Sequence, residues 1–158
     1  MTEIVEIKQS IYSAFSGIAS SIGYSDIHGR IIAALLVFNK KLSLQDLAKE
    51  TCYSISTISL SLDLLESLGM VKKIKNAGDR KLYVELKSNL LEGLKKAFMI
   101  KLQKNITDSL TKFENYKVTL KKIKDGEGKK VLRVLNILEG EIRRLDTYIN
   151  LLSKLKLP

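Results

Sequence analysis

Hydrophobic residues recur along the first part of this chain with a helical period of three to four residues. This period is found in four stretches: residues 2–21, 25–39, 43–51 and 55–68. Only Cys52, Tyr53 and Ser54 separate the last two stretches. Two helices joined by so short a connection must cross steeply, so the pattern predicts a helix-turn-helix.

The ends of the two short helices carry residues that are typical of helix termini. Ser43 can accept a hydrogen bond from a free backbone N–H, and Asp46 three residues later complements the positive end of the helix. Ser54 is placed to cap the second helix, and Gly69 follows it as a left-handed stop. The residues of the second helix predicted to face the core are Ile55, Ile58, Leu62 and Leu65.

After this motif come two short stretches rich in residues that favour β-strands. Val71 and Ile74 mark one strand, and Leu82, Val84 and Leu86 mark a second. The residues between them, 76–80, are mostly polar and include a glycine, so the strands form a β-hairpin, or wing, over residues 71–86. The predicted fold class is therefore mainly α, an α+β winged helix-turn-helix with an N-terminal helix and a long C-terminal helical hairpin.

Two long helices are predicted after the wing. Asn89 and Glu92 form a capping box that begins a helix to about residue 124, and the glycines within 125–128 interrupt it before the last helix. Their apolar residues alternate steps of three and four, as in a coiled coil. The residues predicted to serve dimerisation are Met99, Leu102, Ile106, Phe113 and Leu120 in the first helix, and Val131, Leu135, Leu138, Ile142, Leu145, Ile149 and Leu152 in the second.

A hairpin of these two helices buries only the apolar residues that face each other. Other apolar side chains, such as Val134 and Leu151, lie beside these seams and would stay in contact with water in a monomer. This favours a homodimer, and the alternative is an intramolecular core that covers all of them. The predicted organisation is an N-terminal helix over 1–24 that can join the dimer interface, a DNA-binding domain over 25–88 and a helical dimerisation region over 89–158.

The positive charge of the chain is concentrated after residue 70. Residues 71–124 hold 15 Lys and Arg against 5 Asp and Glu, whereas residues 1–70 hold 5 against 7. A surplus of this kind fits a polyanionic partner, because neutralising phosphates releases counterions. The alternative is a lysine-rich helix face that water solvates.

Composition excludes several other classes of protein. The chain has one histidine, His28, and one cysteine, Cys52, so it lacks the residues for a catalytic triad, a disulfide framework or a metal site at ligand spacing. We expect no enzyme activity and no cofactor, and we predict that Cys52 is a packing residue. No apolar run is long enough to span a membrane, and residues 1–10 lack the layout of a secretory signal, so we expect a cytoplasmic protein with no membrane partner.

The helix-turn-helix and wing resemble the MarR-type winged-helix regulators, and within them the GbsR-like branch. The resemblance covers about a third of the chain closely and rests on three motifs: Ser56-Thr57-Ile58-Ser59, Leu65-Glu66-Ser67-Leu68-Gly69-Met70-Val71 and Gly78-Asp79-Arg80-Lys81. It implies a homodimeric transcription regulator that binds double-stranded DNA, and a small-molecule effector whose identity the sequence does not specify. It also implies that Arg80 reaches the minor groove while Asp79 holds it in place.

The predicted DNA-binding residues come from the corner, the second helix and the wing: Tyr53, Ser54, Ser56, Thr57, Ser59, Lys72, Lys73, Lys75, Asp79, Arg80 and Lys81. The chain departs from the family pattern because no basic residue lies between Thr51 and Met70. We therefore expect the wing cations, and not the second helix, to supply most of the affinity for DNA. Two alternative functions remain at this point, an architectural DNA-binding protein of low sequence specificity and a protein-interaction module that uses Leu60 and Leu64.

Overall fold

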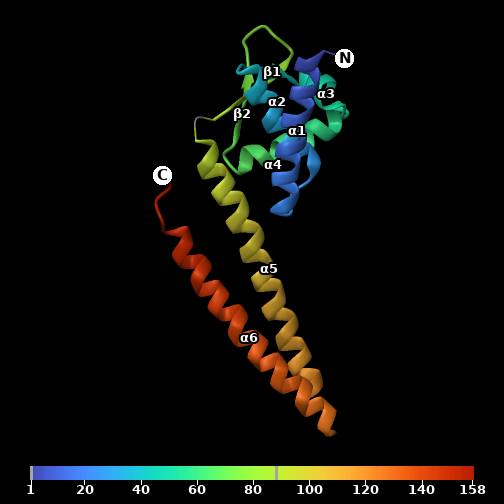
Figure 1. Cartoon of the computed structure of the whole chain (residues 1–158), viewed down its shortest axis with the longest axis vertical. Helices are drawn as coiled ribbons and strands as arrows, with labels where there is room; N and C mark the ends of the chain where they lie inside the picture. Colours follow the sequence, from blue (N-terminus) through green and yellow to red (C-terminus); the bar gives the residue numbers. More distant parts are fainter. Residues whose placement is uncertain (1, 88) are drawn as a thin grey trace. The chain divides into compact units, whose positions relative to one another are not determined.

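The computed structural model describes residues 2–87 and 89–158 (Figure 1). The described residues form two compact units, unit 1 up to Ala97 and unit 2 from Phe98 onward. Residue 88, the predicted end of the DNA-binding domain, lies outside the described residues. The elements of unit 1 are α1 (Glu3–Ser21), α2 (Asp26–Phe38), β1 (Leu42–Ser43), α3 (Leu44–Thr51), α4 (Ile55–Ser67), β2 (Val71–Lys75) and β3 (Leu82–Leu86). Helix α5 (Leu90–Leu120) begins in unit 1 and continues into unit 2, which also contains α6 (Gly126–Ser153).

The core of unit 1 is built around α2, as the apolar sequence of this helix predicts. Ile31 and Leu35 are buried in it, together with Tyr12 of α1 and Leu47 of α3. Helices α1 and α2 approach each other closely at Gly29, where an added Cβ atom would lie 2.3 Å from the backbone oxygen of Phe15. A larger residue cannot be placed there without moving one of the two helices.

The wing is part of a three-stranded antiparallel sheet with the order β1-β3-β2. Strands β2 and β3 pair from Val71 with Leu86 to Lys75 with Leu82, which confirms the predicted hairpin. The two-residue strand β1 pairs Leu42 with Val84 on the other side of β3. Strand β1 was not predicted from the sequence, because two residues are too few for a period to be detected.

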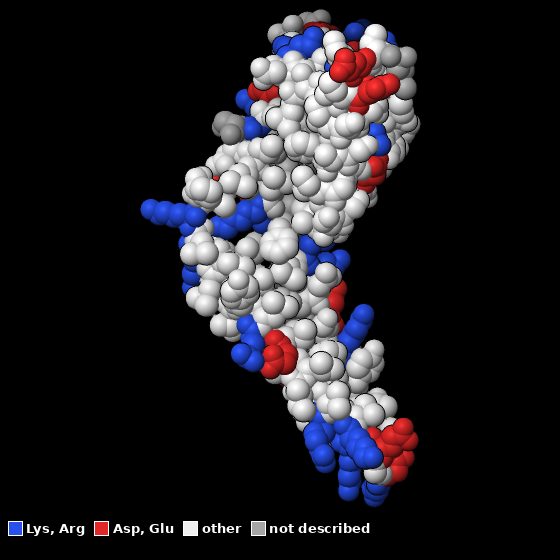
Figure 2. Space-filling model, in the orientation of Figure 1, with Lys and Arg blue, Asp and Glu red and all other residues white. Residues whose placement is uncertain are grey.

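Unit 2 contains the antiparallel pair formed by α6 and the part of α5 that follows residue 97 (Figure 1). Gln103 Nε2 of α5 donates to Asp146 Oδ1 of α6 at 3.0 Å, and Lys117 forms an ion pair with Glu139. Figure 2 shows Lys and Arg side chains gathered at the end of this unit where the two helices meet.

The connection between α5 and α6 differs from the prediction. Helix α5 ends at Leu120, and the glycines expected to form the loop lie in the first turn of α6. Asp125 caps α6 by accepting a hydrogen bond from the Gly128 amide at 2.7 Å, and an added Cβ at Gly128 would lie 2.8 Å from Ile123 Cγ2. Here the aspartate cap begins a helix through two glycines, because the cap satisfies a free amide and Gly128 leaves room for Ile123.

Within the described residues, no helix is long and apolar enough to cross a membrane.

Candidate nucleic-acid interface

The predicted helix-turn-helix is present as α3, the three-residue connection 52–54 and α4. The Asp46 amide donates to Ser43 Oγ at 3.1 Å, and the Thr57 amide donates to Ser54 Oγ at 3.2 Å, so both predicted caps are confirmed. Cys52 closes α3 in the left-handed conformation with φ of 60°. Its side chain is exposed, so the prediction that Cys52 is a packing residue is wrong. The reason is that this helix-terminal position leaves the side chain in solvent.

Helix α4 is held by one face and leaves the other uncovered. Ile58, Leu62 and Leu65 are buried as predicted. Ile55, which was assigned to the same apolar face, is 46% exposed, and Leu60 is 73% exposed. Ile55 lies in the first turn of α4, at the edge of the buried stripe, where the core does not reach around the helix.

The hydroxyl groups at the start of α4 form hydrogen bonds with one another. Ser54 Oγ lies 3.1 Å from Ser56 Oγ and 2.8 Å from Thr57 Oγ1. All three residues are exposed, whereas Ser59 is half-buried. The predicted DNA-binding hydroxyls are therefore brought together at one helix end, where part of their hydrogen-bonding capacity is already used.

The Tyr53 side chain connects the corner between α3 and α4 to helix α2. Its hydroxyl donates to Asp26 Oδ2 at 2.7 Å, and the same carboxylate accepts from Arg30 Nε at 2.8 Å and from Ser16 of α1. The hydrogen bonds from Ser16 and Tyr53 are the main reason why the pKa of Asp26 lies below its ordinary value. This role of Asp26 was not predicted from the sequence, although an acidic residue in the first turn of a helix is a common signal for capping or ion pairing.

The wing tip is braced by Asp79. Its Oδ1 accepts from the Lys81 amide at 2.9 Å and its Oδ2 accepts from the Tyr83 hydroxyl at 3.2 Å. The hydrogen bond from the Lys81 amide is the largest cause of a pKa below the ordinary value for Asp79. Gly78 has φ of 82°, which a side chain disfavours. The turn is thus held in shape by Asp79 and Gly78, and Arg80 and Lys81 are exposed on it.

Lys73 of β2 is engaged with the acidic residues of α4. Its ammonium group forms ion pairs with Asp63 and, at 3.8 Å, with Glu66 Oε1, and its backbone amide donates to Glu66 Oε2 at 3.3 Å. The hydrogen bond with Asp63 raises the pKa of Lys73 above its ordinary value. Lys72 and Lys75, its neighbours in the strand, are exposed. The five predicted wing cations therefore differ in environment, and Lys73 joins the wing to α4.

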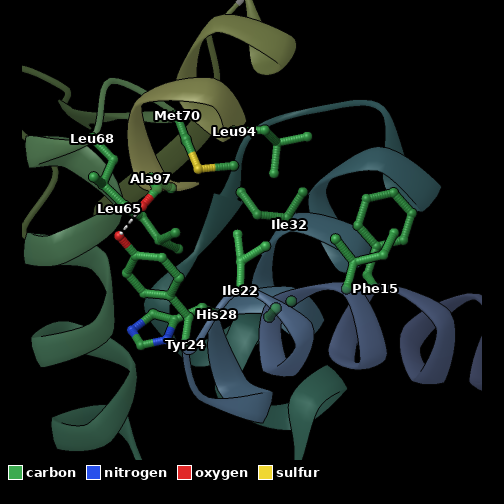
Figure 3. Close-up of a pocket in the computed structure, with 13 residues that line it drawn as sticks. Phe15, Ile22, Tyr24, His28, Ile32, Leu65, Leu68, Met70, Leu94 and Ala97 are labelled. Atoms are coloured by element: carbon green, nitrogen blue, oxygen red, sulfur yellow. Dashed lines mark hydrogen bonds between the residues drawn. The ribbon is translucent and has the colours of Figure 1, made fainter. Parts of the chain in front are cut away.

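An apolar pocket lies in unit 1 beside α4, lined by residues of α1, α2, α4 and the first turns of α5 (Figure 3). Tyr24 closes part of it by donating its hydroxyl to the Ala97 carbonyl at 2.8 Å. His28 lies next to Tyr24, and its Nδ1 accepts from the Ser25 amide at 3.2 Å, so the histidine forms part of a capping box. The cavity measures about 40 Å³, far below the 300 to 1,000 Å³ that is typical of ligand pockets.

The predicted dimerisation residues fall into three groups in unit 2, according to how exposed they are. Ile106, Leu135 and Ile149 are buried within the hairpin itself. The half-buried group comprises Met99, Leu102, Phe113, Leu120, Ile142 and Leu152. Val131, Leu138 and Leu145 are exposed, and Leu138 and Leu145 have exposed fractions of 48% and 37%. The hairpin thus covers part of the predicted seam and leaves part of it in contact with solvent.

No protein-family model matches this chain, and no curated protein matches it either. Similar solved structures include a transcriptional regulator with a TM-score of 0.54 and 20% identity, which covers 92% of this chain and 95% of that one. A MarR mutant from E. coli complexed with operator DNA has a TM-score of 0.42, 17% identity and coverage of 60% and 67%. NadR in complex with 4-hydroxyphenylacetate has a TM-score of 0.44, 20% identity and coverage of 97% and 91%.

At 20% identity the likeness to the first of these structures concerns the fold and does not extend to function. The architecture agrees with the fold class predicted from the sequence: mostly helical, with a small three-stranded antiparallel sheet and a helical C-terminal region. The chain has a winged helix-turn-helix fold.

Proposed function

We propose that this chain is a DNA-binding transcription regulator that acts as a homodimer. The observation that carries the proposal is the uncovered face of α4 in the same compact unit as a basic wing. A helix fixed by one face and free on the other suits insertion into the major groove. The ion pairs of Lys73 with Asp63 and Glu66 hold the wing against this helix.

The exposed cations of the wing supply the affinity in this proposal. Lys72, Lys75, Arg80 and Lys81 are exposed within ten residues, whereas α4 has no cationic side chain. Phosphate contacts of this kind are independent of sequence and release counterions, so binding should weaken strongly as salt rises. The braced turn at Asp79 and Gly78 presents Arg80 at the wing tip, where a narrow minor groove would attract it.

The homodimer is supported by apolar side chains of α6 that the hairpin leaves exposed. These side chains are defined here as the α6 stripe: Val131, Val134, Ile137, Leu138, Leu145, Tyr148 and Leu151. The stripe extends along most of a 28-residue helix, and a long row of exposed apolar side chains of this kind marks an interaction site. A second copy of the chain covers such a stripe with an identical one, and the resulting dimer carries two α4 helices.

The proposed mechanism does not involve a small molecule in the pocket beside Tyr24. The cavity beside Tyr24 is too small to hold an organic ligand in this conformation.

Arg80→Ala should weaken binding to every duplex by about tenfold or more per subunit, because hydrogen bonds to charged groups contribute about 1.5–3 kcal/mol. The loss should be largest on sites with an A·T-rich, narrow minor groove. The measurement is fluorescence anisotropy on a site selected from a random duplex library and on a scrambled site. Lys156→Ala, which removes the same charge from unit 2, serves as the control.

The outcomes of this experiment separate the functions considered. Preference for the selected site identifies a sequence-reading regulator, and equal binding to both duplexes identifies an architectural protein. If neither duplex binds, the proposed function is wrong. If Arg80→Ala binds DNA as tightly as the wild type, the proposed role of the wing tip in DNA affinity is wrong.

Lys72→Ala and Lys73→Ala should have different effects on salt dependence. Lys72 is exposed, so its loss should lower the slope of log K against log salt by about one unit per subunit, which corresponds to one phosphate contact. The Lys73 ammonium is engaged by Asp63 and Glu66, so its loss should leave the slope close to that of the wild type. Titrations at several salt concentrations measure both slopes, and an equal decrease for the two variants would show that Lys73 contacts a phosphate.

A further inference from the structure

We propose that the exposed face of α4 recognises thymine methyl groups in the major groove, with Leu60 as the main contact and Ile55 as a second one. This inference rests on the proposed function and specifies its ligand as A·T-containing DNA that is read by apolar contact. It differs from the wing mechanism, which concerns phosphates and the minor groove.

The composition of α4 excludes the usual hydrogen-bonded readout of bases. Arg or Lys recognises guanine and Asn or Gln recognises adenine, in each case through paired hydrogen bonds. None of these residue types occurs in α4, whose side chains from Ile55 to Ser67 are aliphatic, hydroxyl or acidic. A specific contact from this helix must therefore use hydroxyls, carboxylates or apolar groups.

Most hydroxyls and both carboxylates of α4 form hydrogen bonds or ion pairs within the protein, which uses part of their bonding capacity. Ser54, Ser56 and Thr57 bond to one another at the start of the helix. The two carboxylates of α4, Asp63 and Glu66, bind Lys73 of the wing. Apolar contact with the thymine C5-methyl group is the mode of direct readout in the major groove that leaves these bonds intact.

Leu60 lies on the exposed face of α4, where it can contact a thymine methyl group. Leu60 is 73% exposed on α4, and Ser56, Leu60 and Asp63 follow one another at spacings of four and three, so they share one face of the helix. Asp63 binds Lys73 of β2, so this face is continuous with the side of the helix that meets the wing. Ile55, which is 46% exposed in the first turn of α4, lies at the opposite edge of the exposed face, next to the buried stripe.

The neighbouring charges favour DNA over a protein as the occupant of this surface. Lys75 is exposed and lies two residues after Lys73, on the same side of the strand, so a ligand on this face meets the exposed Leu60 beside a cation. A DNA duplex presents methyl groups in its major groove and phosphates along the rims of that groove, which matches this pairing. A protein partner that used Leu60 would instead need an apolar patch next to acidic residues.

The test replaces individual thymines of a selected duplex by deoxyuridine, which lacks only the C5-methyl group. Wild-type affinity should fall about fourfold for each contacted thymine, the effect of removing one buried methyl-sized group. With Leu60→Ala the same replacements should have little effect, because the side chain that contacts the methyl is gone. Leu155→Ala, which truncates another exposed leucine in unit 2, should respond to deoxyuridine as the wild type does.

The results also separate this inference from the function on which it rests. If the wild type binds the duplex but tolerates deoxyuridine at every position, methyl recognition is wrong while DNA binding stands. If Leu60→Ala keeps the full sensitivity to deoxyuridine, Leu60 is not the contact. If no duplex binds, both proposals fail, and an interaction of Leu60 with a protein becomes the better explanation. Because Leu60 is exposed, its replacement by alanine should not unfold the chain, and circular dichroism checks this.

Discussion

Leu138→Asp combined with Leu145→Asp is expected to convert a dimer into a monomer that keeps its helical content. Both side chains belong to the α6 stripe and are 48% and 37% exposed in the single chain, so the hairpin can tolerate aspartate there. In a dimer the two positions would be buried, and an unpaired carboxylate in an apolar contact costs several kcal/mol. Light scattering at micromolar concentration measures the mass, and circular dichroism measures the helices.

The matched control is Asn136→Asp combined with Asn150→Asp. It creates two new carboxylates at exposed positions of the same helix outside the α6 stripe, so it should stay dimeric. A wild-type chain that is already monomeric at micromolar concentration would contradict the homodimer. Loss of helical content in the Leu138 and Leu145 variant would show that these residues stabilise the hairpin itself.

Gly29→Ala is expected to destabilise unit 1 by about 3 kcal/mol. An added Cβ would lie 2.3 Å from the backbone oxygen of Phe15 and 2.6 Å from the Ser16 amide nitrogen, which no rotamer change can relieve. Overpacking of a core usually costs about 1–3 kcal/mol, and the upper end applies because the contacts are with backbone atoms. The shift of α1 would also disturb the hydrogen bond between Ser16 and Asp26. Urea unfolding followed by circular dichroism measures the loss.

Gly17→Ala is the control, and it should change the stability of unit 1 in the opposite direction. Gly17 lies in the interior of α1, and an added Cβ there meets no other atom within 4 Å. Alanine is favoured over glycine in an open helix position by about 0.8–1 kcal/mol, so this variant should be slightly more stable than the wild type. If Gly29→Ala and Gly17→Ala unfold at the same urea concentration, α1 and α2 do not approach each other as closely at Gly29 as described.

The local elements of unit 1 could be predicted from the sequence because their signals lie within a few neighbouring residues. Ser43 with Asp46, Ser54 with Thr57 and Gly69 with its positive φ each act over a single helix turn. The hairpin was equally local, because its strands pair across a short turn. The dimerisation and DNA-binding roles assigned from the same patterns remain predictions for the experiments above.

The boundaries of the core were decided only by the tertiary structure. The helical period placed Ile55 and Ile58 on one apolar face, but the core covers Ile58 and leaves Ile55 largely exposed. A period specifies the direction of a side chain and not how far neighbouring elements extend over it. The strand β1 and the start of α6 were missed for a related reason, since pairing with β3 and packing of Gly128 against Ile123 define them.

The contacts that shape the candidate site join residues that are distant in the chain, and the sequence alone could not pair them. Tyr53 meets Asp26 across 27 positions, and Lys73 meets Asp63 across ten. Each of these residue types has many chemically suitable partners, and the fold selects one by bringing it within hydrogen-bonding distance. The sequence by itself determined the helices, the wing and the positive charge of the chain. The tertiary structure decided which wing lysine forms ion pairs within the protein and which apolar side chains remain exposed.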